Sequence, residues 1–169
     1  GRFDLPFNTA LQQWLNAPST TVRTPIYRFF NTRTGTHFYT LSVAERDLVI
    51  TKLREYSYEG PAFFAFAAAA PGTSPVHRFL NTRTGAHFYT ISDQERAQVL
   101  ATLPGYQYEG VAWYASTSQA AGSTPMFRFF QTKTQTHFYT INAGERDSVQ
   151  QNLRVYSYEG AAYFGWTSL

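Results

Sequence analysis

The stretch His37-Phe38-Tyr39-Thr40 decides how the rest of the chain is interpreted, because the same four residues return at 87–90 and again at 137–140. The interval is 50 residues both times. A fixed period of this size is typical of repeat architectures, in which one supersecondary unit is copied and the copies bury their apolar faces against one another. The sequence therefore predicts a structure and a function built from one unit used three times.

The composition allows a folded domain and excludes several classes of protein. Of the 169 residues, 43% are hydrophobic and 18% are aromatic, which is enough for a core. The net charge is only +3 and the arginines are spread along the chain, so we expect no nucleic-acid partner. The absence of cysteine excludes disulfides, thiolate metal sites and cysteine nucleophiles. No apolar run reaches the ~18 residues of a membrane-spanning helix, so we expect no membrane insertion.

The period divides the chain into one compact domain with repeats over 24–73, 74–123 and 124–169. Small, polar, glycine-containing linkers at 67–73 and 116–123 separate the copies. Residues 1–23 stand outside the repeats and predict an N-terminal capping segment. In it, Asn8 begins a short helix that carries Leu11, Trp14 and Leu15 on one face.

Within a unit, the pattern predicts strands on both sides of a helix. Aromatic runs at 26–30 and 36–40 flank turn residues and indicate a hairpin. Ser42 and Glu45 have the spacing of a capping box, which predicts a helix whose buried face carries Val49, Ile50 and Leu53. Residues 56–60 and 62–64 then predict a second pair of strands, with a bulge or a positive φ at the glycine between them.

The expected fold is therefore α+β and β-rich, with three β-β-α-β-β units. We expect a closed pseudo-threefold arrangement, propeller-like or trefoil-like, because closure removes exposed sheet edges. The third unit departs from the others, since Gln131 and Gln135 replace Asn31 and Gly35. Its turn is predicted to be strained or differently built.

The repeated polar residues are the candidates for a binding site. If Phe29 pairs with His37 in the hairpin, one face carries Tyr27, Phe29, His37 and Tyr39, and alternation puts His37 and Tyr39 on one face in any register. A histidine beside a phenol, with Glu59 arriving from the next strand pair, combines hydrogen-bonding groups with an aromatic platform. Proteins bind sugars with this mixture.

Other interpretations of the same residues stay open. A buried pair between Arg28 and Glu59 would stiffen each unit and bind nothing, since buried polar groups must be paired. An acid and base pair of His37 with Glu59, or of Glu59 with Asp47, is disfavoured because the second copy has Ala97 in place of Asp47. With one repeated histidine per unit, a metal site requires the three to meet on the threefold axis. We expect no metal, no cofactor and no catalysis, although a hydrolase remains a minor possibility.

The combined pattern resembles a known family of repeat domains. It runs from Tyr27-Arg28-Phe29-Phe30-Asn31 through the HFYT quartet and Glu45-Arg46 to Tyr58-Glu59-Gly60, and it covers 24–169. It is similar to the HFYT-type repeat domain, which is catalogued as a domain of unknown function and is appended to secreted and surface-attached proteins of bacteria and some fungi, including wall-lytic enzymes and glycosidases. The resemblance implies a secreted or cell-surface accessory module that attaches its carrier to a polysaccharide.

The sequence thus predicts a monomeric, non-catalytic, lectin-like module with up to three related sites for a glycan or cell-wall polysaccharide. The alternative is a structural or protein-interaction module whose repeated polar residues are scaffold. The predicted ligand-binding residues are His37, Tyr39, Tyr58, Glu59, His87, Tyr89, Tyr108, Glu109, His137, Tyr139, Tyr158, Glu159 and Trp113.

Overall fold

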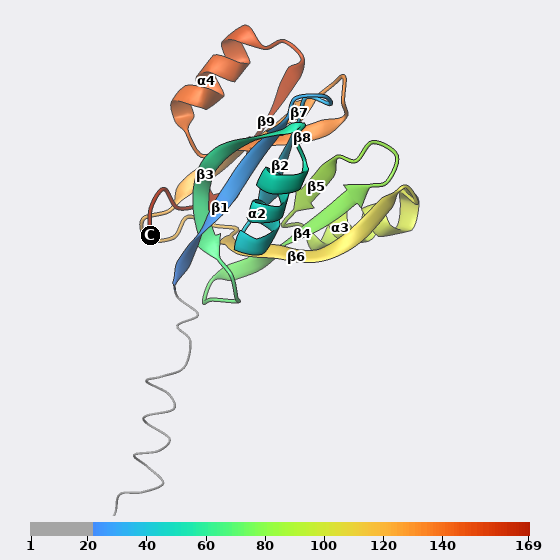
Figure 1. The fold of residues 1–169 in the computed structure, drawn as a ribbon. Helices are drawn as coiled ribbons and strands as arrows, with labels where there is room; N and C mark the ends of the chain where they lie inside the picture. The colour runs from blue at the N-terminus through green and yellow to red at the C-terminus, as the bar shows by residue number, and fades with distance from the viewer. Residues whose placement is uncertain (1–21) are drawn as a thin grey trace, which may run out of the picture.

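The structure is a computed structural model, and it describes residues 22–169. In that part of the chain each unit supplies two strands, a helix and one further strand. The first unit contains β1 (Arg23–Asn31), β2 (Thr36–Thr40), α2 (Val43–Lys52) and β3 (Tyr56–Phe66). The second contains β4 (Thr73–Asn81), β5 (His87–Thr90), α3 (Asp93–Thr102) and β6 (Tyr106–Ser116), and the third β7 (Thr124–Gln131), β8 (Thr136–Thr140), α4 (Ala143–Asn152) and β9 (Tyr156–Gly165). Figure 1 shows the helices on the outside and the strands gathered between them.

The predicted β-β-α-β-β unit is wrong in its second half. The expected second strand pair is one long strand, β3 in the first unit, which pairs with β1 from Arg23↔Phe66 to Asn31↔Tyr56. Gly60 has φ +86°, and the register shifts on both sides of its partner Arg28. The glycine therefore makes a bulge that bends a continuous strand, in agreement with the predicted bulge, instead of a turn that reverses it.

The expected closed propeller-like or trefoil-like arrangement is also wrong. The nine strands form one antiparallel sheet in the order β2-β1-β3-β6-β9-β7-β8, with β4 paired to β6 and to β5. Single residue pairs at strand ends, Phe66↔Tyr114 and Ser116↔Phe164, carry the sheet from one unit to the next. Because the long strands continue the sheet in this way, the units do not become separate blades. Over residues 22–169 the sheet is not closed, and β2, β5 and β8 each pair with one strand only.

The main core lies where the three units meet. Among its buried side chains are Ile26, Tyr39, Phe63, Val76, Tyr89, Trp113, Met126, Tyr139 and Tyr163. A smaller cluster of Tyr27, Phe29, Phe38 and Val49 packs beneath α2, and the corresponding third-unit residues pack beneath α4. Each fully buried aromatic side chain contributes about 1.5–3 kcal/mol. The aromatic excess in the composition is therefore largely explained by packing.

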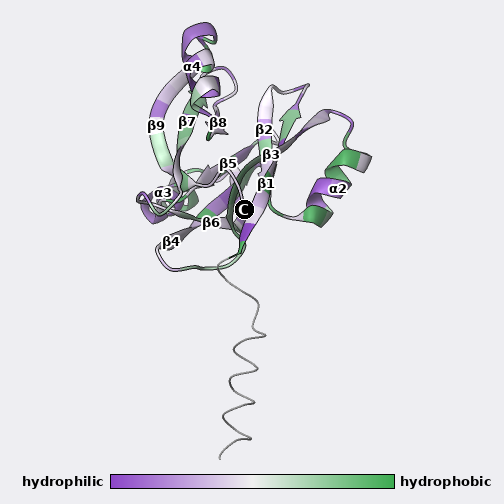
Figure 2. Ribbon diagram, turned by 90° about the vertical axis from the view of Figure 1, so that its left-hand side faces the viewer, coloured by the Kyte–Doolittle hydropathy of each residue, from purple (hydrophilic) through white to green (hydrophobic). Residues whose placement is uncertain are grey.

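The helices begin where the capping pattern predicts. Ser42 accepts a hydrogen bond from the Glu45 amide at 3.1 Å, and Ser92 and Asn142 do the same in the other units. Val49 is the buried residue of α2, whereas Ile50 is 48% exposed. The predicted apolar face is thus narrower than expected. Figure 2 shows hydrophobic and hydrophilic segments alternating along α2, and the apolar residues Leu48 and Ile50 are 56% and 48% exposed.

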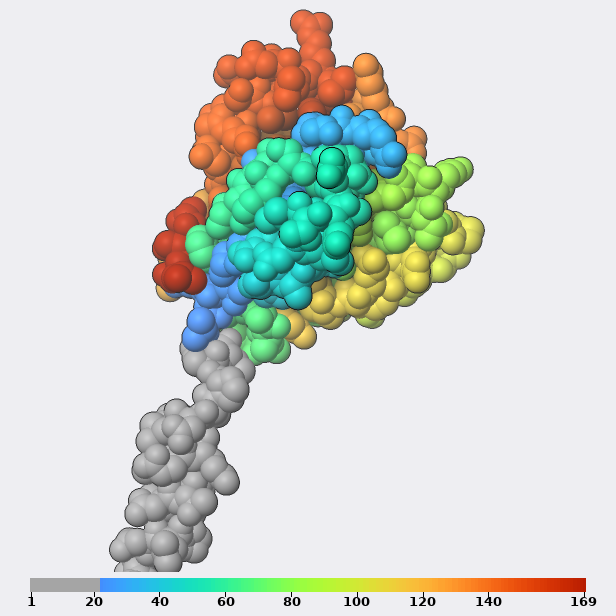
Figure 3. All heavy atoms as spheres, in the orientation of Figure 1, coloured from blue at the N-terminus to red at the C-terminus, as the bar shows by residue number. Residues whose placement is uncertain are grey.

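The three units lie side by side, each in contact with both others through hydrogen bonds or strand pairs (Figure 3). The third unit meets the first where Trp166 exchanges two backbone hydrogen bonds with Phe64, at 2.8 and 3.0 Å. The capping helix predicted from Asn8 lies outside the described residues.

Candidate binding grooves between the units

Strand alternation places an arginine and a histidine on one face of each hairpin. In the first unit Arg28 lies opposite Tyr39, and Phe30 lies opposite His37. Residues two apart on a strand and residues opposite each other share a face, so these four side chains point the same way. His37 and Tyr39 share a face as predicted, and Arg28 joins them.

The predicted register of this hairpin is wrong by one residue. Phe29 lies opposite Phe38, not opposite His37. The turn explains the difference, because the side-chain oxygen of Asn31 accepts from the amides of Arg33 and Thr34 at 3.0 and 3.1 Å. These bonds close a four-residue loop and put Phe29 on the helix side, against the core.

Arg28 joins two carboxylates that come from different units. Its Nε donates to Glu59 Oε1 at 2.9 Å within the first unit. Its two terminal nitrogens donate to Oε1 and Oε2 of Glu145, at the start of α4, at 3.0 and 3.3 Å. Burial disfavours the charged guanidinium, but the nearby Tyr39 and Glu145 outweigh that effect and raise the pKa of Arg28 above its ordinary value. The arginine is therefore a permanent cation held between two acids.

The same arrangement occurs between every pair of units. We call it the first, second or third groove according to the unit that supplies the arginine. The first groove contains Arg28, His37 and Glu59, facing Phe138 and Glu145. The second contains Arg78, His87 and Glu109, facing Phe38 and Glu45. The third contains Arg128, His137 and Glu159, facing Phe88 and Glu95.

Each groove histidine lies between an acid and an aromatic ring. The Nε2 atoms of His37, His87 and His137 are 3.6, 3.2 and 3.1 Å from Oε1 of the glutamate in the same unit. The His37 ring also lies 5.1 Å from the Phe30 ring and 4.7 Å from the Phe138 ring, between centroids. Burial, and then the charge of Arg28, lowers the pKa of His37 to about 3, so its imidazole is neutral at pH 7.

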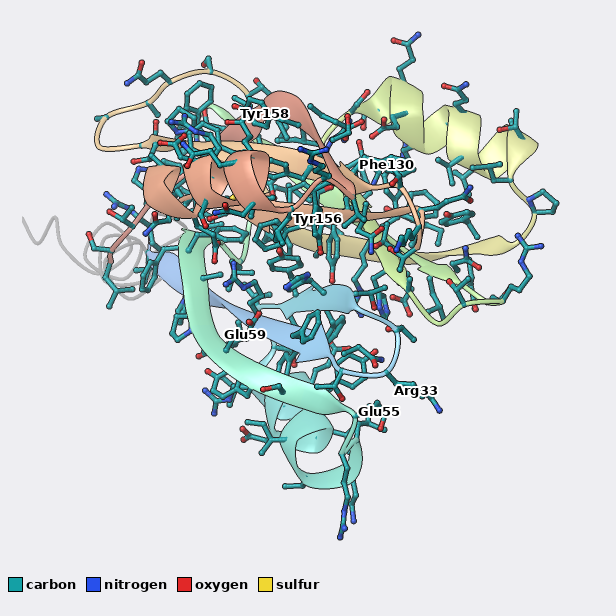
Figure 4. All side chains as sticks on the ribbon, turned by 90° about the horizontal axis from the view of Figure 1, so that it is seen from above. Arg33, Glu55, Glu59, Phe130, Tyr156 and Tyr158 are labelled. Carbon is teal, nitrogen blue, oxygen red and sulfur yellow. The ribbon has the colours of Figure 1, made fainter. Side chains whose placement is uncertain are left out.

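The first groove contains a pocket of about 310 Å³ with apolar and charged walls. Its apolar wall comes mostly from the third unit, where Leu153 is 46% exposed and Tyr156 begins β9, and Phe30 of the first unit completes it. Burial, and then the Glu59 carboxylate across the groove, raises the pKa of Tyr156 above its ordinary value. Figure 4 labels Glu59 and Tyr156, with Arg33 and Glu55 at the tip of the first unit, away from both. The second groove has a matching pocket of about 190 Å³.

The predicted site tyrosines of the HFYT quartets lie deeper than the grooves. Tyr39, Tyr89 and Tyr139 are only 1–2% exposed. The Tyr39 hydroxyl donates to the Tyr139 carbonyl, the Tyr139 hydroxyl to the Tyr89 carbonyl, and the Tyr89 hydroxyl to the Tyr39 carbonyl, at 2.6–2.9 Å. These hydrogen bonds connect the three units to one another beneath the groove histidines.

The other predicted site residues divide between the grooves and the scaffold. Glu59, Glu109 and Glu159 line the grooves. Tyr58 lies on the helix side, 5.0 Å from the Phe29 ring, and Tyr108 and Tyr158 have the same position. Trp113 is 1% exposed and stacks on Tyr89 at 5.2 Å.

The helix glutamates are the groove residues that the sequence analysis missed. Glu45 was explained by the capping box, and half of that box is present, since Ser42 caps the Glu45 amide. The Glu45 carboxylate instead accepts from both terminal nitrogens of Arg78, at 2.8 and 3.1 Å. The usable signal was the joint identity of one arginine and two glutamates in all three copies, because a capping role accounts for only one of the glutamates.

The chain belongs to the family described as domain of unknown function DUF5648, whose model matches residues 14–166. Comparisons with curated proteins and with solved structures found no match.

Within residues 22–169, no three His, Asp or Glu side chains are grouped so that they could hold a metal ion. The three repeated histidines lie in separate grooves, each with its own glutamate. In the same part of the chain, no helix has the length and apolar character needed to cross a membrane.

Proposed function

We propose that this chain is a non-catalytic carbohydrate-binding module whose sites are the three grooves between units. The observation that carries the proposal is the first-groove pocket of about 310 Å³, in which Phe30, Phe138 and Tyr156 face Arg28 and Glu59. Aromatic faces pack against the CH groups of a sugar ring, and fixed charged groups exchange hydrogen bonds with its hydroxyls. A pocket of this volume is at the small end of ligand sites, which suits one or two sugar rings.

Three copies of one weak site are useful on a surface that displays many copies of the ligand. The second and third contacts are then intramolecular, and avidity exceeds single-site affinity by roughly 10²-fold or more. On this proposal the module is secreted or displayed at the cell surface, where it attaches a carrier protein to a cell-wall polysaccharide.

The test uses a difference between the natural copies. Leu80 in the second unit occupies the position of Phe30 and Phe130, so the fold accepts leucine there. A glycan array with the native protein identifies ligands, and titration calorimetry then compares it with the F30L/F130L double variant. Loss of ring stacking is expected to weaken each altered site about fivefold, and the reverse change L80F to strengthen the second site. A folded native protein that binds no glycan on the array would refute the proposal.

A second candidate function is a structural or protein-interaction module. The observation in its favour is that each groove arginine is already paired with two carboxylates from two units, which stabilises the contact between those units without any ligand. On that view F30L/F130L changes stability only, and pull-down from surface extracts recovers a protein partner instead of a glycan.

A further inference from the structure

The charge balance of the grooves is opposite to that of the chain. The whole chain carries +3. The first groove contains one arginine and two glutamates, with a neutral histidine between them, which leaves a net charge of −1. The second and third grooves repeat one arginine and two glutamates. Acidic pockets in a basic protein favour a cationic ligand over an anionic one.

The arginines are poorly placed to bind an anion. In the first groove Nε and both terminal nitrogens of Arg28 already donate to carboxylates at 2.9–3.3 Å. An incoming carboxylate would have to displace one of them, and it would approach Glu59 and Glu145 at the same time. The negative charge of the incoming carboxylate would be repelled by both glutamates, because like charges in a partly buried site are weakly screened.

The strand glutamates, in contrast, each keep one carboxylate oxygen that can accept a hydrogen bond from a ligand. Among residues 22–169, the hydrogen bonds of Glu59 and Glu109 end on Oε1, and the shortest ion-pair contacts of Glu59, Glu109 and Glu159 do so too. In each groove the second carboxylate oxygen, Oε2, is therefore available to a ligand. The Glu59 side chain is 32% exposed, so a ligand can reach it.

Aromatic rings line the same pocket as the strand glutamate. In the first groove they are Phe30, Phe138 and Tyr156. The Phe138 ring already has one cation near it, with Arg28 Cζ 5.3 Å from its centroid. Ring faces and a carboxylate together attract an ammonium group, and an ammonium donates hydrogen bonds that a hydroxyl or an acetamide matches only in part.

We infer that the three grooves take sugars that carry a free amino group, such as the glucosamine residues of de-N-acetylated chitin. The amine donates to the free oxygen of the strand glutamate, and the sugar ring packs on the apolar wall formed by Leu153 and Tyr156 in the first groove. This inference rests on the proposed function and specifies its ligand class.

The test compares matched oligosaccharides on the native protein. Tetramers of glucosamine, of N-acetylglucosamine and of galacturonic acid are titrated by calorimetry at about pH 5.5, where the sugar amine is protonated. The glucosamine tetramer is expected to bind about tenfold more tightly than its N-acetylated counterpart, with a preference that falls as salt is added. The galacturonate tetramer is expected to bind least.

A single-site variant assigns the preference to the groove. E59Q keeps an acceptor for Arg28 and removes the charge, so the number of glucosamine sites is expected to fall from three to two. E55Q, at the tip of the first unit, is the control and is expected to keep all three. Circular dichroism checks that both variants fold, and the comparison of ligands on the native protein does not depend on either variant.

The outcomes separate the two proposals. Equal or tighter binding of the N-acetylated or acidic tetramer would overturn the amino-sugar inference and leave the carbohydrate-binding function in place. Binding of none of the tetramers, together with a blank glycan array, would overturn both.

Discussion

Single residues of the HFYT quartet have three different tasks. In the first unit His37 lines a groove, Phe38 packs under α2 and also approaches His87 of the next groove, and Tyr39 is buried between units. Alternation along the strand predicts which face each residue takes. It does not predict depth, so the sequence assigned Tyr39 to the same site as His37. How deeply a side chain is buried depends on which units pack over that face of the strand. The spacing of residues in the sequence contains no information about that packing.

The buried tyrosines give a graded prediction. The Tyr39 hydroxyl donates to the Tyr139 carbonyl and accepts from the Tyr139 amide, at 2.9 and 3.0 Å, whereas among residues 22–169 the Tyr139 hydroxyl makes one hydrogen bond, to the Tyr89 carbonyl. Y39F therefore leaves two buried backbone groups unpaired and Y139F leaves one, at about 1–3 kcal/mol each. We expect Y39F to lower the free energy of unfolding in urea roughly twice as much as Y139F.

The control for this comparison is Y58F. Tyr58 is 40% exposed, and no hydrogen bond of its hydroxyl occurs among residues 22–169. We expect its unfolding midpoint to match that of the native protein. Equal losses in Y39F and Y139F would show that the hydroxyls do not hold the units together through these bonds.

At the scale of elements, the third hairpin stores backbone strain. Its turn has the same hydrogen bonds as the others, with Gln131 Oε1 accepting from the amides of residues 133 and 134 at 2.7 and 3.2 Å. Of the two alternatives that the sequence left open, the turn is strained and not differently built. Gln135 has φ +57° where Gly35 and Gly85 have +72° and +76°. A side chain in the left-handed region costs about 1–2 kcal/mol.

The strain predicts that Q135G stabilises the protein. Relief of the left-handed penalty is partly offset by the greater chain entropy of glycine, so the expected gain in unfolding free energy is about 0.5–1 kcal/mol. The matched reverse change is G35Q, which meets open space at Cβ and is expected to lose a similar amount. Chemical denaturation of both measures the effect. A loss of stability in Q135G would contradict the strain argument.

The elements themselves were largely predictable, and their joins were not. Aromatic runs, turn residues and Ser42 three places before Glu45 indicated the hairpin and the helix, and both are present. The predicted register was wrong because the hydrogen bonds of the Asn31 side chain select a four-residue loop, and the sequence pattern alone does not specify the loop length. The predicted second pair of strands was wrong because a glycine with positive φ fits a bulge in one strand as well as a turn between two.

At the scale of the whole molecule, three units share one sheet and three grooves. The sequence predicted the repeats but left open whether the sites lie within units or between them, and the structure builds each groove from two units. Contacts between copies leave little trace in one sequence, because every copy carries both halves of the contact. This is also why an open sheet joined at strand ends could not be distinguished from separate blades.

The groove histidines make the stability of the whole molecule depend on pH. Burial, and then the charge of the neighbouring arginine, lowers the pKa of His37 to about 3 and lowers that of His137, from an ordinary 6.5. As the pH falls below 6.5, the unfolded chain takes up protons at these positions more readily than the folded protein does. The free energy of unfolding therefore falls, by up to about 1.4 kcal/mol per pH unit for each histidine.

Urea denaturation between pH 7 and about 5 tests this dependence, and the H37Q/H137Q variant is expected to show a shallower slope. The window stays above the ordinary pKa of 4.5 for glutamate, because Glu45, Glu109 and Glu145 also have lowered pKa values and add their own loss of stability only at lower pH. Parallel curves for the native protein and the variant would contradict the lowered pKa values of His37 and His137.

The shared grooves also constrain how such a chain can change during evolution. A substitution at Phe138 alters the packing beneath α4 in its own unit and the ring that faces His37 in another. A substitution at Glu145 likewise removes a partner of Arg28, 117 positions away. Selection on one copy is therefore transmitted to its neighbours, so the copies cannot drift independently. The close likeness of the three repeats is then a consequence of their mutual dependence, and it would persist long after the duplications that produced them.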